Sequence, residues 1–199
     1  LRDEFIYTPQ KEISRDVKKI LIIFGGVDQN NLTMKVLEAL KLLELKSLEI
    51  LVIVGLGYKW RDRLERYISE LNVEGFKVRF LRNPRIISKY IKESDIAITS
   101  NGRTIYEIAS IGTPCISISQ NERESMHLFA KISGAVINLG MASSVTVNDI
   151  ANAIDKLIKD YHLRKMMNEK MRSFSLREGV KRVIKIIFEK YDAWKGDVY

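Results

Sequence analysis

Cysteine, histidine and proline are scarce in this chain of 199 residues. It contains one cysteine, two histidines and three prolines. A single cysteine excludes an intramolecular disulfide bond, which fits a protein of the reducing cytoplasm. His127 and His162 are far apart in the sequence, and neither has a partner at the spacing of a metal site. The sequence therefore predicts neither a disulfide-stabilised domain nor a bound metal ion.

Long apolar runs are also missing. No stretch approaches the roughly 18 apolar residues that a membrane-spanning helix needs. The formal net charge is +8, from 33 basic and 25 acidic residues, but the two signs are interleaved almost everywhere. The basic excess is largest between residues 156 and 190, where aromatic residues do not alternate with it as a nucleic-acid stacking surface requires. We therefore expect solvated surface charge and no nucleic-acid partner; membrane-surface association stays open, without a feature that supports it.

The chain does contain a regular alternation of short apolar runs and amphipathic segments. Six apolar runs predict buried strands, and the segments between them have apolar residues at the spacing of one helix face. This alternation predicts an α/β, Rossmann-like three-layer sandwich with a mainly parallel six-stranded sheet. The expected strands are residues 19–24, 50–54, 77–81, 95–99, 114–119 and 135–138. The expected helices are residues 32–45, 59–71, 86–93, 104–111, 125–132, 147–158, 163–171 and 176–199.

The same pattern divides the chain into three parts. Residues 1–18 are polar, precede the first expected strand, and are expected to be a connection from an upstream domain. Residues 19–175 are expected to form the Rossmann-like domain. Residues 176–199 are expected to form a C-terminal helix that packs back toward the upstream domain.

The loop after the first expected strand is a candidate site. In an open parallel sheet, ligands bind at the carboxyl ends of the strands. Gly25 and Gly26 stand there and let the backbone approach a ligand closely. The loop continues through Asp28 into a helix whose N-terminal N–H groups favour an anion. An ordinary strand-to-helix turn is the alternative explanation.

The loop after the fourth expected strand holds the same kind of position. Asn101, Gly102, Arg103 and Thr104 crowd a helix start, where backbone amides, a hydroxyl group and a positive charge can hold a diphosphate. Helix capping uses the same residue types and is the alternative. Glu107 is either a carboxylate for both hydroxyl groups of a ribose or the second member of a capping box with Thr104.

Two further loops carry weaker signals. Asn121 and Glu122 follow the fifth expected strand and can hydrogen-bond sugar hydroxyl groups, although a solvated helix start has the same composition. Arg82 and Asn83 follow the third expected strand and can offer groups to the edge of a nucleotide base.

Other patterns indicate structure rather than chemistry. Gly55-Leu56-Gly57 follows the second expected strand, but Trp60 stands where a dinucleotide-binding fingerprint has its third glycine. Cys115 lies inside an apolar strand, which is typical of core packing and not of a nucleophile. His127 is expected to be an ordinary helix residue.

The order of these motifs resembles a known family, the UDP-sugar hydrolases of pseudaminic acid biosynthesis. Residues 24–33, FGGVDQNNLT, are similar to the family segment FGGSDPxNLT, and residues 95–107, DIAITSNGRTIYE, to its DLAIxAGGSTxxE. The remaining similarities are residues 112–114 to GxP, residues 121–122 to NQ, residues 134–140 to GAAxxLG, and residues 1–5 to the inter-domain connection LLRxEF. The resemblance covers the C-terminal domain of that family nearly end to end.

This resemblance implies the C-terminal half of a GT-B fold, in which two Rossmann-like domains face a cleft and UDP binds mainly to the C-terminal one. No metal ion or other cofactor is implied, because a helix dipole takes the place of the metal. Carried over, the site is Gly25 and Gly26 near the phosphates, Gly102 and Thr104 at the diphosphate, Glu107 at the ribose, and Asn121 and Glu122 at the sugar.

The chain departs from the family at two positions of this site. Asn101-Gly102-Arg103 stands where the family has Gly-Gly-Ser, and Glu122 where it has Gln, so the sugar and the choice between hydrolysis and transfer stay open. The family's catalytic histidine belongs to an N-terminal domain that this chain does not contain.

We therefore expect the UDP-sugar-binding half of a hydrolase or hexosyltransferase of surface polysaccharide or nonulosonic acid biosynthesis. The isolated chain is expected to be inactive and to need an N-terminal domain or a partner subunit. The alternative is a non-catalytic nucleotide-binding module.

Overall fold

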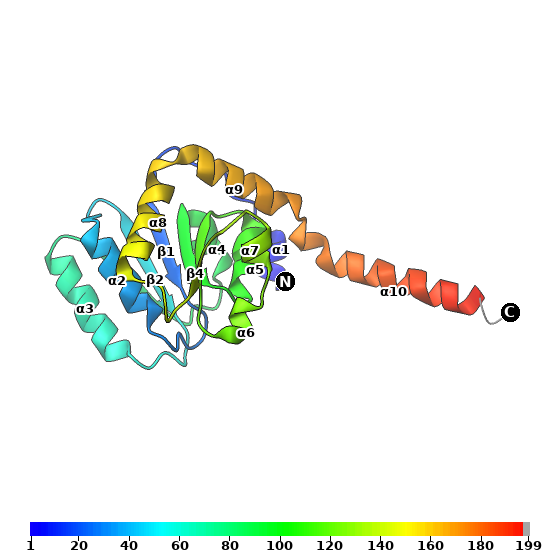
Figure 1. Cartoon of the computed structure of the whole chain (residues 1–199), viewed down its shortest axis with the longest axis horizontal. Helices are drawn as coiled ribbons and strands as arrows, with labels where there is room; N and C mark the ends of the chain where they lie inside the picture. Colours follow the sequence, from blue (N-terminus) through cyan, green and yellow to red (C-terminus); the bar gives the residue numbers. More distant parts are fainter. Residues whose placement is uncertain (197–199) are drawn as a thin grey trace.

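The computed structural model contains one six-stranded sheet with helices on both of its faces (Figure 1). It describes the backbone of residues 1–196 and the side chains of residues 1–190. The strand order is β3-β2-β1-β4-β5-β6, and every neighbouring pair is parallel. The strands are β1 (Lys19–Ile23), β2 (Glu49–Val54), β3 (Lys77–Arg82), β4 (Ile96–Ser100), β5 (Cys115–Ser119) and β6 (Ile137–Met141). The predicted Rossmann-like sandwich is confirmed.

The central strands are apolar throughout because both of their faces are covered. Leu21 and Ile22 are neighbours on β1, point to opposite faces of the sheet, and are both fully buried. They belong to two separate hydrophobic cores, one on each side of the sheet. The apolar runs of the sequence therefore correctly indicated a sheet between two layers of helices.

The helices divide between these two cores. One core includes side chains of α2 (Leu32–Leu42), α3 (Arg61–Val73) and α8 (Val147–Lys159). The other includes side chains of α1 (Asp3–Tyr7), α4 (Ser88–Glu93), α5 (Thr104–Ile111) and α7 (Phe129–Ile132). Helix α9 (Tyr161–Ser173) closes the end of the sandwich, with Met167 in the first core and Met171 in the second.

Two elements differ from the sequence prediction. The helix expected over residues 125–132 is two short helices, α6 (Glu122–Ser125) and α7. The break has a physical cause: the Asn101 amide donates to the backbone carbonyls of Glu124 and His127, so these carbonyls are held by a side chain at the break. The sixth strand starts at Ile137, two residues later than expected, after a turn in which Gly134 has a φ of 59°.

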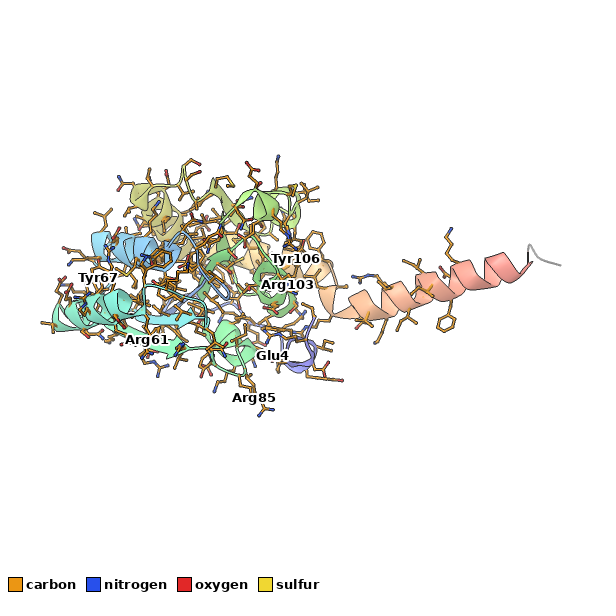
Figure 2. All side chains as sticks on the ribbon, turned by 90° about the horizontal axis from the view of Figure 1, so that it is seen from below. Glu4, Arg61, Tyr67, Arg85, Arg103 and Tyr106 are labelled. Carbon is orange, nitrogen blue, oxygen red and sulfur yellow. The ribbon has the colours of Figure 1, made fainter. Side chains whose placement is uncertain are left out.

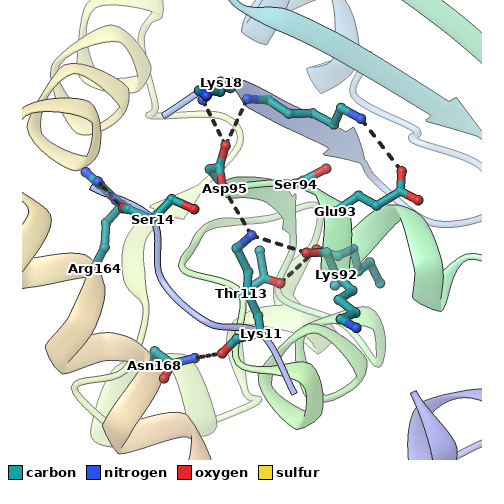
Figure 3. Close-up of polar contacts among 12 residues, drawn as sticks. Lys11, Ser14, Lys18, Lys92, Glu93, Ser94, Asp95, Thr113, Arg164 and Asn168 are labelled. Atoms are coloured by element: carbon teal, nitrogen blue, oxygen red, sulfur yellow. Dashed lines mark hydrogen bonds and ion pairs between the residues drawn. The ribbon is translucent and has the colours of Figure 1, made fainter. Parts of the chain in front are cut away.

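The segment before β1 is fastened to the amino ends of the strands (Figure 3). The buried carboxylate of Asp95 accepts hydrogen bonds from the backbone N–H groups of Lys18 and Lys19, at 2.8 and 3.1 Å, and pairs with Lys11 Nζ at 3.2 Å. Arg164 is 1% exposed and donates to carbonyl groups of both this segment and the end of α8. Polar groups thus fix the course of the chain before β1, opposite the candidate site.

The chain ends in a helix that extends away from the rest of the molecule (Figure 1). A short 3₁₀ turn, Leu176–Glu178, leads into α10 (Gly179–Gly196). Six of its apolar side chains are about half exposed or more: Val180, Val183, Ile184, Ile186, Ile187 and Phe188. The helix expected over residues 176–199 is therefore present through residue 196, and its last three residues lie outside the described part of the chain. Among the described helices, none has the length and apolar character that crossing a membrane requires.

Candidate functional site

The candidate loops converge at the carboxyl ends of β1 and β4. The strand order reverses direction between these two neighbours, and such a switch point is where open parallel sheets form a ligand crevice. Two cavities of about 640 and 360 Å³ lie there. They share Gly25, Gly26, Arg103 and Thr104 in their walls, so the α5 start lies between them.

The larger cavity is mostly apolar with charged groups at its rim. Its lining comes from the ends of β1 and β2, from α5, and from the N-terminal segment. Figure 2 labels Arg103 and Tyr106, which stand in its wall. The lining residues are Leu1, Arg2, Ile23, Gly25, Gly26, Ile53, Val54, Gly55, Asn83, Pro84, Ile87, Arg103, Thr104, Tyr106 and Glu107.

The smaller cavity is more polar. It lies between the loop after β1, the α5 start and the loop after β5. Its lining residues are Phe24, Gly25, Gly26, Val27, Asp28, Gln29, Ser100, Gly102, Arg103, Thr104, Gln120, Asn121 and Glu124. The structure thus brings together loops that are about 95 residues apart in the sequence, as the strand pattern predicted.

The first turn of α5 carries free hydrogen-bond donors. Arg103 is the N-cap residue, and no side chain caps the helix. The capping box between Thr104 and Glu107 is therefore absent, which removes the alternative explanation for this pair. Among the described residues, no acceptor reaches the N–H groups of Arg103 and Thr104. Free N–H groups at a helix start, beside an exposed arginine, favour an anion in the space between the two cavities.

Glu107 lies one turn into α5, in the wall of the larger cavity. Its side chain is 16% exposed, and its Oε1 accepts from Arg2 Nε and Nη2 at 3.3 and 3.2 Å. Burial raises the pKa of Glu107 above its ordinary value of 4.5, and the nearby Arg2 opposes that rise. Among the described residues, no donor reaches Oε2, so one carboxylate oxygen is free for a ligand.

Gly25 and Gly26, after β1, line both cavities with backbone atoms alone. Gly25 has a φ of 75°, a conformation that favours glycine, and neither Gly25 nor Gly26 has an atom within 4 Å of its would-be Cβ. Gly55, after β2, is what lets this loop approach: a Cβ there would lie 2.4 Å from the Gly26 Cα. The Gly26 carbonyl also accepts from the Gly57 N–H at 3.0 Å. The Gly55–Gly57 turn therefore supports the candidate site from behind.

Asp28 and Asn101 hold the loops rather than face the cavities with free groups. The Asp28 carboxylate accepts from the N–H groups of Leu32 and Thr33, both at 2.9 Å, and from Gln120 Nε2 at 2.9 Å. Asn101 is fully buried, lines neither cavity, and donates to the two carbonyls at the α6–α7 break. Asp28 thus ties the loop after β1 to the loop after β5.

The remaining predicted residues are distributed unevenly. Asn83 lines the larger cavity, whereas the exposed Arg82 lines neither. Asn121 lines the smaller cavity, but its side-chain oxygen caps α6 by accepting from the Glu124 N–H at 3.0 Å. Glu122 is exposed and lines neither cavity.

Of the residues that the sequence set aside, Cys115 packs in the core as expected, but the helix predicted at His127 was wrong. This residue lies in the break between α6 and α7. Cys115 is fully buried, and burial raises the pKa of its thiol. His127 lines neither cavity, and its ring centroid lies 6.4 Å from that of Tyr106. Within the described part of the chain, no three His, Cys, Asp or Glu side chains are grouped as a metal site requires.

Arg2 and Tyr106 line the larger cavity and were not singled out from the sequence. Gly55 was set aside with its turn, and Glu124 belongs to the polar loop after β5 but was not among the predicted sugar contacts. A glycine directly after a strand was a usable signal for Gly55. The other three reach the site through tertiary contacts between segments that the sequence does not show to be neighbours.

The fold and site geometry agree with a comparison to protein families. Residues 20–184 match the model of the glycosyltransferase family 28 C-terminal domain. The chain belongs to this family. The resemblance found in the sequence motifs is therefore confirmed at the family level. The matched region contains the strand-end loops of the candidate site but not Leu1 and Arg2, which also line the larger cavity.

Curated relatives include enzymes and proteins of polysaccharide biosynthesis. The spore coat polysaccharide biosynthesis protein SpsG of Bacillus subtilis is 25% identical over 183 residues, which cover 90% of this chain and 52% of SpsG. A Helicobacter pylori protein named as pseudaminic acid cytidylyltransferase and UDP-2,4-diacetamido-2,4,6-trideoxy-beta-L-altropyranose hydrolase is 29% identical over 137 residues. That match covers 65% of this chain and 23% of the relative.

A solved structure shows where the fold belongs. MurG of Acinetobacter baumannii superposes with a TM-score of 0.66 at 17% identity, over 90% of this chain and 54% of MurG. The domain therefore has the architecture of the C-terminal half of a GT-B glycosyltransferase. The chain spans about half of the length of SpsG and about a quarter of the Helicobacter relative.

Proposed function

We propose that this chain is the UDP-sugar-binding half of a two-domain hydrolase or hexosyltransferase in surface polysaccharide or nonulosonic acid biosynthesis. The observation that carries the proposal is the α5 start, where free N–H groups and Arg103 stand between two cavities. A diphosphate placed there has room for a nucleoside on one side and a sugar on the other. The names of the relatives support this class of ligand.

The nucleoside belongs in the larger cavity. The ribose is joined directly to the diphosphate, so its hydroxyl groups come to lie near the first turn of α5, where Glu107 has a free oxygen. A carboxylate accepts from ribose hydroxyls through charge-assisted hydrogen bonds. The base then reaches the loop after β3, where Asn83 lines the cavity and its N–H is held by the Val54 carbonyl at 2.8 Å. Binding through a helix start and an arginine needs no metal ion.

UDP binding by the isolated chain tests this proposal. We expect calorimetry to show that UDP binds more tightly than CDP or GDP, because the base contacts its own loop rather than the phosphate site. Arg103→Ala should weaken UDP binding by about tenfold, which corresponds to about 1.4 kcal/mol. Arg66→Ala, on the surface of α3, is the matched control and should leave the affinity unchanged. Absent binding, or equal binding of all three nucleotides, contradicts the proposal.

The isolated chain should bind the sugar nucleotide without turning it over. In a two-domain fold with a central cleft, the base that activates the attacking group comes from the facing domain. We propose that an N-terminal domain of the same protein, or a partner subunit, supplies it, and that α10 packs toward it through its exposed apolar side chains. Incubation with UDP-sugars, followed by chromatography of released UDP, should show no hydrolysis. Efficient hydrolysis would place the catalytic base within this chain.

A further inference from the structure

One carboxylate in the smaller cavity has no role in the account so far. Glu124 lies on α6, and three hydrogen bonds fix it from three directions. Its Oε2 accepts from the Gln120 N–H at 2.8 Å, its own N–H donates to Asn121 Oδ1 at 3.0 Å, and its carbonyl accepts from Asn101 Nδ2 at 2.8 Å. Two of these bonds hold the Glu124 backbone, and the third holds one oxygen of its carboxylate in place before any ligand arrives.

The other oxygen of this carboxylate is free and lies against the α5 start. A Cβ on Gly102 would lie 2.9 Å from Glu124 Oε1, so a side chain at position 102 would displace this oxygen from its present position. Among the described residues, no donor reaches Oε1. Gly102 and Glu124 both line the smaller cavity. A fixed hydrogen-bond acceptor thus stands beside the proposed diphosphate site, on the side away from the nucleoside.

We infer that Glu124 Oε1 accepts a hydrogen bond from a hydroxyl group of the bound sugar and makes the smaller cavity selective for uncharged hexoses. This rests on the proposed function, because the diphosphate on α5 is what delivers the sugar to this cavity. An acceptor that gains a donor from the ligand strengthens binding, whereas one that meets a second negative charge weakens binding. A uronic acid would bring its carboxylate into a cavity already lined by Asp28 and Glu124.

The negative charge of Glu124 should also weaken the binding of UDP that carries no sugar. An ionised Glu124 repels a diphosphate bound at Gly102–Thr104, and UDP without a sugar has no hydroxyl donor to offset this repulsion. Removing the charge therefore leaves UDP binding unchanged or strengthens it, while it weakens the additional binding that the sugar provides. A residue with a purely structural role would weaken both.

The experiment compares Glu124→Gln with Glu70→Gln, a matched change at an exposed glutamate on α3 that lines neither cavity. Calorimetry measures UDP, UDP-glucose, UDP-galactose, UDP-N-acetylglucosamine and UDP-glucuronic acid on each protein. Gln keeps an oxygen for the Gln120 N–H, so the fold should persist, and melting curves check it.

In the wild-type protein, at least one uncharged UDP-hexose should bind more tightly than UDP, and UDP-glucuronic acid more weakly than that hexose. Glu124→Gln should reduce the ratio of the Kd for UDP to the Kd for that hexose by about tenfold. It should also reduce the discrimination against UDP-glucuronic acid, whereas Glu70→Gln should change neither quantity.

Three results overturn the inference while UDP binding, and with it the proposed function, stands. The wild-type protein binds UDP-glucuronic acid as tightly as the uncharged hexoses, no hexose binds more tightly than UDP, or Glu124→Gln leaves the ratio unchanged. The first two need no variant and hold even if Glu124→Gln fails to fold. Failure of the wild-type protein to bind UDP would instead contradict the proposed function itself.

Discussion

At the scale of single residues, two carboxylates in the cavity walls share one property: each has one oxygen fixed by the protein and the other without a donor among the described residues. Glu107 gives Oε1 to Arg2, and Glu124 gives Oε2 to a backbone N–H. The place of Glu107 in the cavity wall was predictable from its position one turn into the helix after Gly102 and Thr104, although a capping box was an equal alternative until the structure excluded it. The place of Glu124 was not predictable, because its orientation depends on Asn101, which is 23 positions away in the sequence and neighbouring in space.

Replacing Glu107 with Gln tests the proposed contact between its carboxylate and the ribose hydroxyl groups of UDP. Gln keeps the shape but removes the charge and one acceptor, so UDP affinity should fall by about tenfold or more. The melting temperature should shift by less than about 3 °C, because Arg2 is half exposed and such an ion pair contributes about 0–1 kcal/mol. Calorimetry and thermal melting measure the two quantities, with Glu70→Gln on the surface of α3 as the control. A lower melting temperature with unchanged UDP affinity would assign Glu107 a structural role only.

The raised pKa of Glu107 gives the same residue a pH signature. The ionised form accepts from the ribose, so UDP affinity should fall as the pH drops through a pKa that lies above 4.5. Glu107→Gln carries no titrating proton and should lose that part of the pH dependence, which calorimetry at pH 5 to 8 measures. An identical pH profile for both proteins would contradict a contact between Glu107 and the ligand.

At the scale of elements, the sequence was most informative where one physical cause acted alone. The four inner strands, β1, β2, β4 and β5, are buried on both faces, so their apolar runs alone marked them, and the β1 bounds differ from the prediction by one residue. The α6–α7 break was missed because its cause is a side chain from the end of β4. Helix α1 was not expected because residues 1–18 are mostly polar, yet Phe5 is fully buried in the second core.

Helix α10 should be dispensable for the fold of the rest of the chain. The side chains of residues 180–188 named above are 47–62% exposed, so their removal loses little packing. A chain that ends at Glu178 should melt within about 3 °C of the full chain and bind UDP with the same affinity. A large loss of stability on truncation would show that α10 belongs to this domain and does not pack elsewhere.

At the scale of the whole molecule, the chain is a domain with one site at the carboxyl edge of its sheet and an apolar helix that leaves its body (Figure 1). Membership of the glycosyltransferase family 28 C-terminal domain family and the GT-B architecture were both predictable, because motif order along the chain records the order of the loops. The sugar and the reaction were not, because the chain departs from the motifs of the resembled family at residues 101–103 and at Glu122.

The most direct test of the central claim is a crystal structure of this chain with UDP. We expect the diphosphate on the N–H groups at the α5 start, the ribose hydroxyls on Glu107, and the base in the larger cavity beside Asn83. For the ribose, Arg2 either yields to the hydroxyl groups or keeps Oε1 while they bind Oε2; both arrangements retain Glu107 as the contact. UDP bound away from α5, or α5 unoccupied at saturating UDP, would contradict the account.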